Sequence, residues 1–127
     1  MGYVFKKHYT RDEARALLPQ IREWLERASA LRRSLSRLED AVTATVAEGH
    51  DTGGENVNRS LRTLADFQQL MREFQARQIL VKDLDRGLID FPAILGGREV
   101  FLCLEKDEED IDFWHDLEAG FAGREKL

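Results

Sequence analysis

Cysteine is almost absent from this chain of 127 residues, since Cys103 is the only one. A single cysteine cannot form an intrachain disulfide, and it is typical of proteins kept in reducing compartments. Long hydrophobic runs are absent as well: no segment approaches the roughly 20 apolar residues that cross a bilayer. The first ten residues, MGYVFKKHYT, lack the apolar core of a signal peptide. These absences predict a cytoplasmic protein without a membrane partner.

Excess positive charge is also missing. The chain has 24 acidic against 19 basic residues and a net charge of −5, which argues against a nucleic-acid partner. What is present is a high charged fraction of 34% beside an ordinary hydrophobic fraction of 43%, a balance that fits elongated helices. The length predicts one domain that covers residues 1–127.

A long amphipathic helix is predicted over residues 10–48. Thr10 and Glu13 have the spacing of a capping box, which marks a helix start. Apolar side chains then recur in alternating steps of four and three, at Leu17, Ile21, Trp24, Ala28, Leu31, Leu35, Leu38, Val42 and Thr45. This is the heptad seam of a coiled coil, and a partner helix is needed to cover it.

A second helix is predicted over residues 55–80, after a glycine-containing turn at residues 48–56. Its apolar side is formed by Val57, Leu61, Leu64, Phe67, Met71 and Phe74. Two amphipathic helices joined by a short turn pack as antiparallel neighbours. The second helix is the shorter one, so part of the first seam is left for another partner, and a homodimer is expected.

The remaining residues, 82–127, have a different pattern. Residues 88–95 and 100–105 are strand-like on either side of Gly96-Gly97, which predicts a β-hairpin. Residues 3–9 are also strand-like, and Ile111, Trp114 and Leu117 predict a short C-terminal helix. The fold class is therefore α+β: a long antiparallel helical hairpin that carries a small β-hairpin or sheet and a short C-terminal helix.

A first candidate site is a group of charged residues, formed by Lys82, Asp83, Asp90, Arg98 and Arg124. Asp90 stands inside an apolar strand, where a buried charge requires a partner. Arg98, across the glycine turn, is the nearest candidate for that partner. Two interpretations remain open: Asp90 fixes the register of the hairpin, or the group lines a pocket for a small ligand.

A second candidate site is metal-binding, with Glu108, Asp112 and His115 as ligands. On a helix, Asp112 and His115 would share a face as metal ligands can. The alternative is that the many acids between residues 105 and 118 stabilise a helix start through its dipole. The sequence identifies no cofactor beyond this candidate divalent metal.

The chain resembles an uncharacterised prokaryotic family catalogued as domain of unknown function 2203. The resemblance rests on VKDLDRGLIDFPAILGGREVFLCLE, IDFWHDLEAGFAGR and the opening YTRDEARALLP. Matching residues are Lys82, Asp83, Gly87, Leu88, Asp90, Phe91, Pro92, Gly97, Arg98, Cys103, Trp114, His115, Gly120, Phe121, Gly123 and Arg124. Leu104 and Asp107 depart from the pattern. The resemblance implies a bacterial intracellular protein and supplies no activity.

The sequence favours a non-enzymatic function. It has no phosphate-binding glycine loop and no serine nucleophile elbow, and Cys103 has the context of a small core residue. We therefore expect an assembly or protein-interaction module built on the helical hairpin, with a second copy or another protein as its partner. The alternative is a small-molecule or divalent-metal-binding domain, an enzyme included, that uses the polar residues within 82–124.

Overall fold

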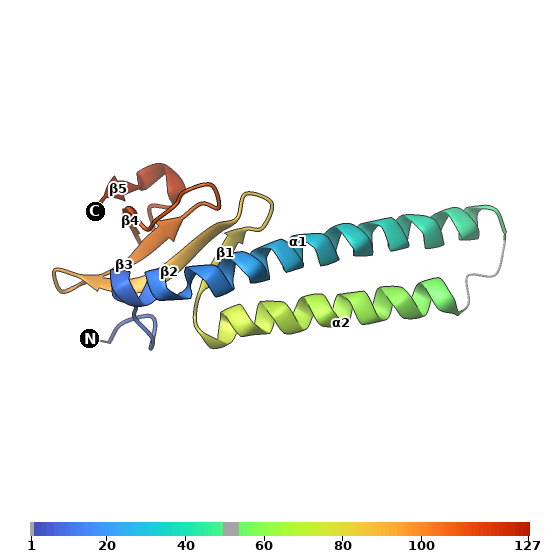
Figure 1. Ribbon diagram of the computed structural model, residues 1–127, viewed down its shortest axis with the longest axis horizontal. Coiled ribbons are helices and arrows are strands. Elements are labelled where there is room, and N and C mark those ends of the chain that lie inside the picture. The colour runs from blue at the N-terminus through green and yellow to red at the C-terminus, as the bar shows by residue number, and fades with distance from the viewer. Residues whose placement is uncertain (1, 50–53) are drawn as a thin grey trace.

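The protein has an α+β fold in which two long helices carry a sheet at one end (Figure 1). The computed structural model describes residues 2–49 and 54–127. The sheet is antiparallel throughout, and its five strands are hydrogen-bonded in chain order. The elements are α1 (Arg11–Ala47), α2 (Glu55–Ala76), β1 (Leu80–Asp83), β2 (Leu88–Leu95), β3 (Arg98–Leu104), β4 (Phe113–Asp116), the 3-10 helix η1 (Phe121–Gly123) and β5 (Glu125–Lys126).

The start of α1 confirms the capping-box prediction. The Thr10 hydroxyl accepts a hydrogen bond from the Glu13 amide at 3.1 Å, and the Glu13 carboxylate accepts one from the Thr10 amide at 3.0 Å. Both bonds satisfy amides that the first turn of a helix leaves unpaired. The helix therefore begins one residue after the capping threonine and runs without a break to Ala47.

The first half of α1 lies between α2 and the sheet. Its buried residues, Ala14, Leu18, Ile21, Leu25 and Ala28, all precede residue 29. They form one core with the sheet residues Ile89, Phe91, Ala93, Val100, Leu102 and Leu104. Beyond the sheet only the two helices remain, side by side and running in opposite directions (Figure 1). Neither helix in the described part of the chain is long and apolar enough to cross a membrane.

The second helix ends at Ala76, four residues before the predicted end at Leu80. Gln78 takes a positive φ of 56°, and the Ile79 amide donates to the carbonyl of Phe74 at 3.0 Å. This left-handed residue stops the helix and turns the chain into β1, which the strand pattern had not predicted. The four residues 50–53 of the predicted turn lie outside the described part of the chain.

Residues 3–9 were predicted as a strand, and that prediction is wrong because side chains take most of their amides. The Glu99 carboxylate accepts hydrogen bonds from the amides of Val4 and Phe5, at 2.8 and 3.0 Å. The Gln78 side-chain carbonyl accepts from the next two amides. A backbone bond to the sheet does occur at Tyr9, whose amide donates to the Pro92 carbonyl at 2.7 Å. The segment thus reaches the edge of β2 beyond Leu80, the first residue of β1.

The predicted C-terminal helix is also wrong. Residues 113–116 form β4, which pairs with β3 on one side and β5 on the other. The acid-rich segment before β4 is a loop held against α1, where Arg15 binds Asp110 at 2.8 Å and Arg11 binds Asp112 at 2.7 Å. The hydrogen bond and charge of Arg15 lower the pKa of Asp110 below its ordinary value. The acids therefore pair with the start of α1 instead of beginning a helix of their own.

Candidate functional site

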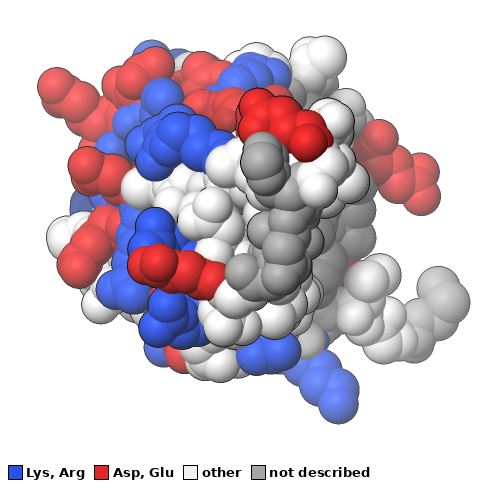
Figure 2. All heavy atoms as spheres, turned by 90° about the vertical axis from the view of Figure 1, so that its right-hand side faces the viewer, with Lys and Arg blue, Asp and Glu red and all other residues white. Residues whose placement is uncertain are grey.

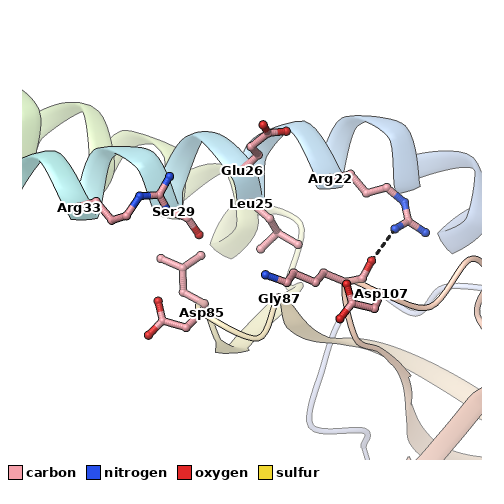
Figure 3. A pocket seen from close by; sticks show the side chains of 10 residues that line it. Arg22, Leu25, Glu26, Ser29, Arg33, Asp85, Gly87 and Asp107 are labelled. Atoms are coloured by element: carbon pink, nitrogen blue, oxygen red, sulfur yellow. Dashed lines mark hydrogen bonds between the residues drawn. The ribbon is translucent and has the colours of Figure 1, made fainter.

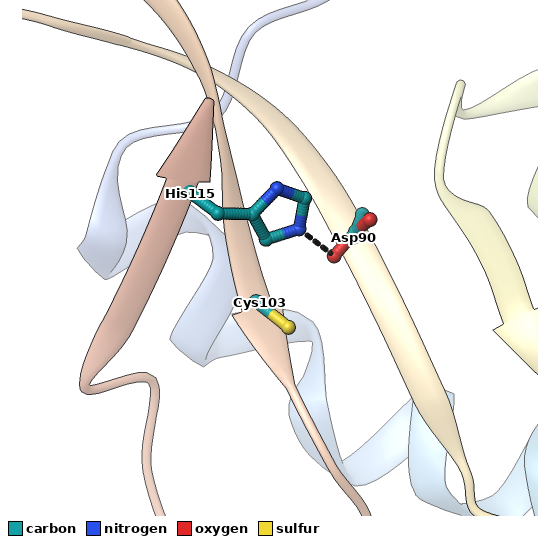
Figure 4. Close-up of side chains that lie close together, drawn as sticks. All are labelled: Asp90, Cys103 and His115. Carbon is teal, nitrogen blue, oxygen red and sulfur yellow. Dashed lines mark hydrogen bonds and ion pairs between the residues drawn. The ribbon is translucent and has the colours of Figure 1, made fainter. Parts of the chain in front are cut away.

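A buried polar cluster lies on the face of the sheet that points away from α1. Asp90 of β2 stands directly opposite Cys103 of β3, and His115 of β4 reaches them from the next strand (Figure 4). Asp90 and His115 are each 2% exposed, and Cys103 is 1% exposed. Alternation along the strands places these residues opposite the apolar side that packs on α1. The cluster thus joins three adjacent strands beneath the surface.

Hydrogen bonds fix the orientation of the His115 ring within the cluster. His115 Nε2 lies 3.0 Å from Asp90 Oδ1, and His115 Nδ1 lies 2.7 Å from the backbone carbonyl of Asp116. The Cys103 thiol lies beside the Asp90 carboxylate, on the facing residue of the next strand. One ligand atom from each of the three residues lies within 4.8 Å of the others. His115 therefore gives the buried carboxylate the partner that a polar group removed from water requires.

The thiol of Cys103 is not a nucleophile in this setting. Burial, with the Asp90 carboxylate beside it, raises the pKa of Cys103 to about 12. Only the thiolate attacks electrophiles, so a thiol that keeps its proton at neutral pH is inert. The cluster can bind a proton or a cation, and it cannot perform thiol catalysis of the usual kind.

Aromatic rings and two cationic side chains cover the cluster. The Phe101 ring packs between His115 and Phe5, with a centroid distance of 5.4 Å to each ring. The Lys82 ammonium lies 5.5 Å from the centre of the Phe101 ring, and the Arg124 guanidinium lies 3.9 Å from that of Phe113. The N-terminal segment that carries Phe5 therefore forms part of this cover.

The structure separates the five residues of the first candidate site. Lys82 and Arg124 reach the same sheet face as Asp90. Arg98 instead lies at the other end of β3 and binds Asp116 at 2.6 Å, so the expected Asp90–Arg98 pair is wrong. Asp83 accepts from the Arg86 amide in the turn between β1 and β2. The partner of Asp90 is His115.

The three residues of the predicted metal site have separate partners. Glu108 binds the Arg124 guanidinium at 2.5 Å and the Glu105 amide at 2.8 Å, while Asp112 binds Arg11. Only His115 enters a cluster of ligand atoms. The prediction placed them together on a helix that does not form, and it missed Cys103. The register of the predicted hairpin could have found Cys103, because the two-residue turn places it opposite Asp90.

A second concave region lies between α1 and the loops at the end of the sheet (Figure 3). It encloses about 370 Å³ and is lined by Arg22, Leu25, Glu26, Ser29, Arg33, Leu84, Asp85, Gly87, Lys106 and Asp107. Arg22 donates to the carbonyls of Lys106, Glu108 and Glu109, so it holds the loop to the helix. The other charged residues of the lining include both acids and bases, so the region favours neither an anionic nor a cationic ligand.

The part of the hairpin that extends beyond the sheet is a third candidate region. None of the described residues in 29–47 or 54–69 is buried, and large apolar side chains are exposed: Val46 to 58%, Leu61 to 60% and Leu64 to 37%. Figure 2 looks onto this end of the molecule and shows uncharged surface bordered by basic and acidic side chains. In this part of the hairpin, the packing of α1 against α2 leaves these apolar side chains exposed.

Comparison with known proteins identifies a family and no relative of established activity. The model of a family described as uncharacterized conserved protein, domain of unknown function 2203 (DUF2203), matches residues 7–127, and the chain belongs to that family. No curated protein and no solved structure is significantly similar to the chain.

Proposed function

We propose that this member of the family is an assembly module, in which two copies of the chain pair through one face of α2. The partner is a second copy of the chain, and the assembly requires no catalytic step. The observation that carries it is the distribution of charge around α2.

Charged residues are confined almost entirely to one side of α2. At about 100° per residue, Glu55, Arg59, Arg62, Asp66 and Glu73 fall within one arc of the helix. The opposite arc, here called the uncharged face, holds Val57, Leu61, Leu64, Ala65, Gln68, Met71 and Gln75, and Arg72 is the one charged residue within it. A helix surface in contact with water is normally rich in charge. An exposed face without charge is typical of an interface.

The uncharged face continues into a hollow beside β1. Met71 and Gln75 of that face line the hollow together with Phe5, Phe74, Gln78, Ile79, Leu80, Val81 and Lys82, around a volume of about 510 Å³. An apolar surface therefore extends from the exposed Leu61 to the edge of the sheet. The 22 residues of α2 give it a length of roughly 33 Å, enough for a partner helix of equal length.

A second copy is the partner that this face fits. The face has Arg72 as its one charged residue, so it offers little to a strongly acidic or basic partner. An antiparallel two-fold arrangement brings the uncharged face against itself, and cyclic dimers are the commonest soluble assemblies. Fully burying a leucine stabilises by about 1.5–3 kcal/mol. Leu61, exposed to 60%, and Leu64, exposed to 37%, would each contribute about 1 kcal/mol per chain.

Light scattering on three proteins tests the proposal. The unmodified chain at tens of micromolar should have about twice the chain mass of 14.7 kDa. The double variant Leu61→Glu, Leu64→Glu should be monomeric, because it places four carboxylates in the interface of each dimer. The control Arg62→Glu changes an exposed charge on the opposite side of α2 and should remain dimeric. A monomeric parent, or a double variant that still dimerises, overturns the proposal.

A further inference from the structure

Both ring nitrogens of His115 face oxygen acceptors. Nδ1 lies 2.7 Å from the Asp116 carbonyl, which can only accept, so Nδ1 carries a proton. Nε2 lies 3.0 Å from the Asp90 carboxylate. A neutral imidazole has one N–H, and it is already used on the carbonyl. A second cation must therefore lie between Nε2 and Oδ1, either a proton or a metal ion.

We propose that Asp90, Cys103 and His115 form a binding site for one zinc ion, or for a divalent ion of similar chemistry such as cobalt. The site is separate from the assembly surface on α2 and rests on different residues. It also differs from the set Glu108, Asp112 and His115, from which it keeps only the histidine.

The three donors match the preferences of zinc. They are one carboxylate oxygen, one thiolate sulfur and one imidazole nitrogen, on three neighbouring strands and within 4.8 Å of one another. Calcium and magnesium prefer oxygen donors alone, whereas zinc accepts all three types. The Asp116 carbonyl holds the Nδ1 proton, which leaves Nε2 for the metal, and such a bond commonly orients a metal-binding histidine.

Charge balance supports an exchange of one ion for two protons. Without metal the cluster holds the thiol and one proton between Nε2 and the Asp90 carboxylate, with a net charge of zero. With metal it holds a divalent ion, a carboxylate, a thiolate and a neutral imidazole, again with a net charge of zero. The proton between Nε2 and Oδ1 and the proton of the thiol leave to solvent as the ion enters. A site that is 1–2% exposed disfavours a change in net charge, and this exchange causes none.

Small side-chain movements bring the donors to bonding distance. Zinc binds nitrogen and oxygen at about 2.0–2.2 Å and sulfur at about 2.3 Å, so tetrahedral donor atoms are separated by roughly 3.3–3.7 Å. The Nε2–Oδ1 separation of 3.0 Å has to open slightly, and the Cys103 sulfur already lies within 4.8 Å of both atoms. The described residues supply three donors, and a water molecule completes four-coordination.

Cobalt titration of the chelator-treated protein tests the site. We expect one equivalent of Co²⁺ to produce the intense visible bands of four-coordinate cobalt and a near-ultraviolet band from thiolate-to-cobalt charge transfer. Because Cys103 is the only cysteine, the charge-transfer band reports on this site alone. Cys103→Ser should lose that band, and one equivalent of Zn²⁺ should bleach the parent spectrum.

The matched control is Asp112→Asn, which alters a carboxylate that binds Arg11 outside the cluster and should keep the full spectrum. A parent spectrum that remains that of hydrated cobalt overturns the proposal without the use of any variant. A charge-transfer band that survives in Cys103→Ser overturns it as well. Circular dichroism of each variant shows that a lost band does not come from unfolding.

Discussion

Replacing Asp90 by alanine should destabilise the protein strongly, because it leaves His115 without its buried partner. The two side chains are 2% exposed and 3.0 Å apart, so water does not replace the lost carboxylate. Removing one member of a buried ion pair costs about 3–5 kcal/mol. For a chain of this length each kcal/mol lowers the melting temperature by roughly 3–5 °C, so we expect a decrease of about 10–20 °C.

The assay is a thermal melt in the presence of a chelator, at one fixed protein concentration because an assembly melts in a concentration-dependent way. Asp90→Asn keeps an oxygen acceptor for His115 and should lose less stability than the alanine variant. Asp107→Ala removes an exposed carboxylate and should change the free energy of unfolding by less than about 0.5 kcal/mol. If Asp90→Ala melts within two or three degrees of the parent, the buried pair does not hold these strands together.

Acid should release the N-terminal segment through Glu99. Desolvation alone would raise the pKa of Glu99, but hydrogen bonds from His8 and from the amides of Phe5 and Val4 outweigh it, so its pKa lies below the ordinary value of 4.5. A carboxylate with a lowered pKa stabilises the folded protein at pH values above its ordinary pKa. This stabilisation is lost as the pH falls through the pKa of the folded state. Melts from about pH 5 to about pH 3 should show a steeper loss in the parent than in Glu99→Gln, and equal slopes would contradict this. Gly87 should be intolerant of a side chain, because its φ is +61° and an added Cβ would lie 2.5 Å from the Lys106 Cβ. Gly87→Ala should cost about 1–3 kcal/mol more than Gly96→Ala, which has a φ of +59° and open space, and equal costs in urea melts would show that the contact relaxes freely.

The helices were predictable because local chemistry determines them. The capping box at Thr10 and Glu13 fixed the start of α1 to within one residue. The end of α2 was missed because the chain turns at Gln78, and a glutamine with a positive φ has no signature in the sequence. The Gln78 side chain accepts hydrogen bonds from the amides of Lys6 and Lys7, which are about 70 positions away in the sequence. Tertiary contacts therefore set this boundary.

The candidate site was partly predictable. The Gly96-Gly97 turn pairs Leu95 with Arg98, and counting outward from that pair places Asp90 opposite Cys103. The position of His115 could not be obtained in this way, because Ile111, Trp114 and Leu117 have helical spacing. In the fold, the outer edge of β3 takes residues 113–116 as a neighbouring strand, and strand pairing outweighs local periodicity. With β4 in place of a helix, the histidine joins the aspartate and the cysteine.

Sedimentation equilibrium of the unmodified chain tests the proposed assembly most directly. Between about 1 and about 100 µM we expect the mass to rise toward twice the chain mass of 14.7 kDa, because the uncharged face of α2 covers itself only when two copies meet. A mass of 14.7 kDa at every concentration would contradict the account, because no second copy of the chain would then cover the exposed Leu61 and Leu64.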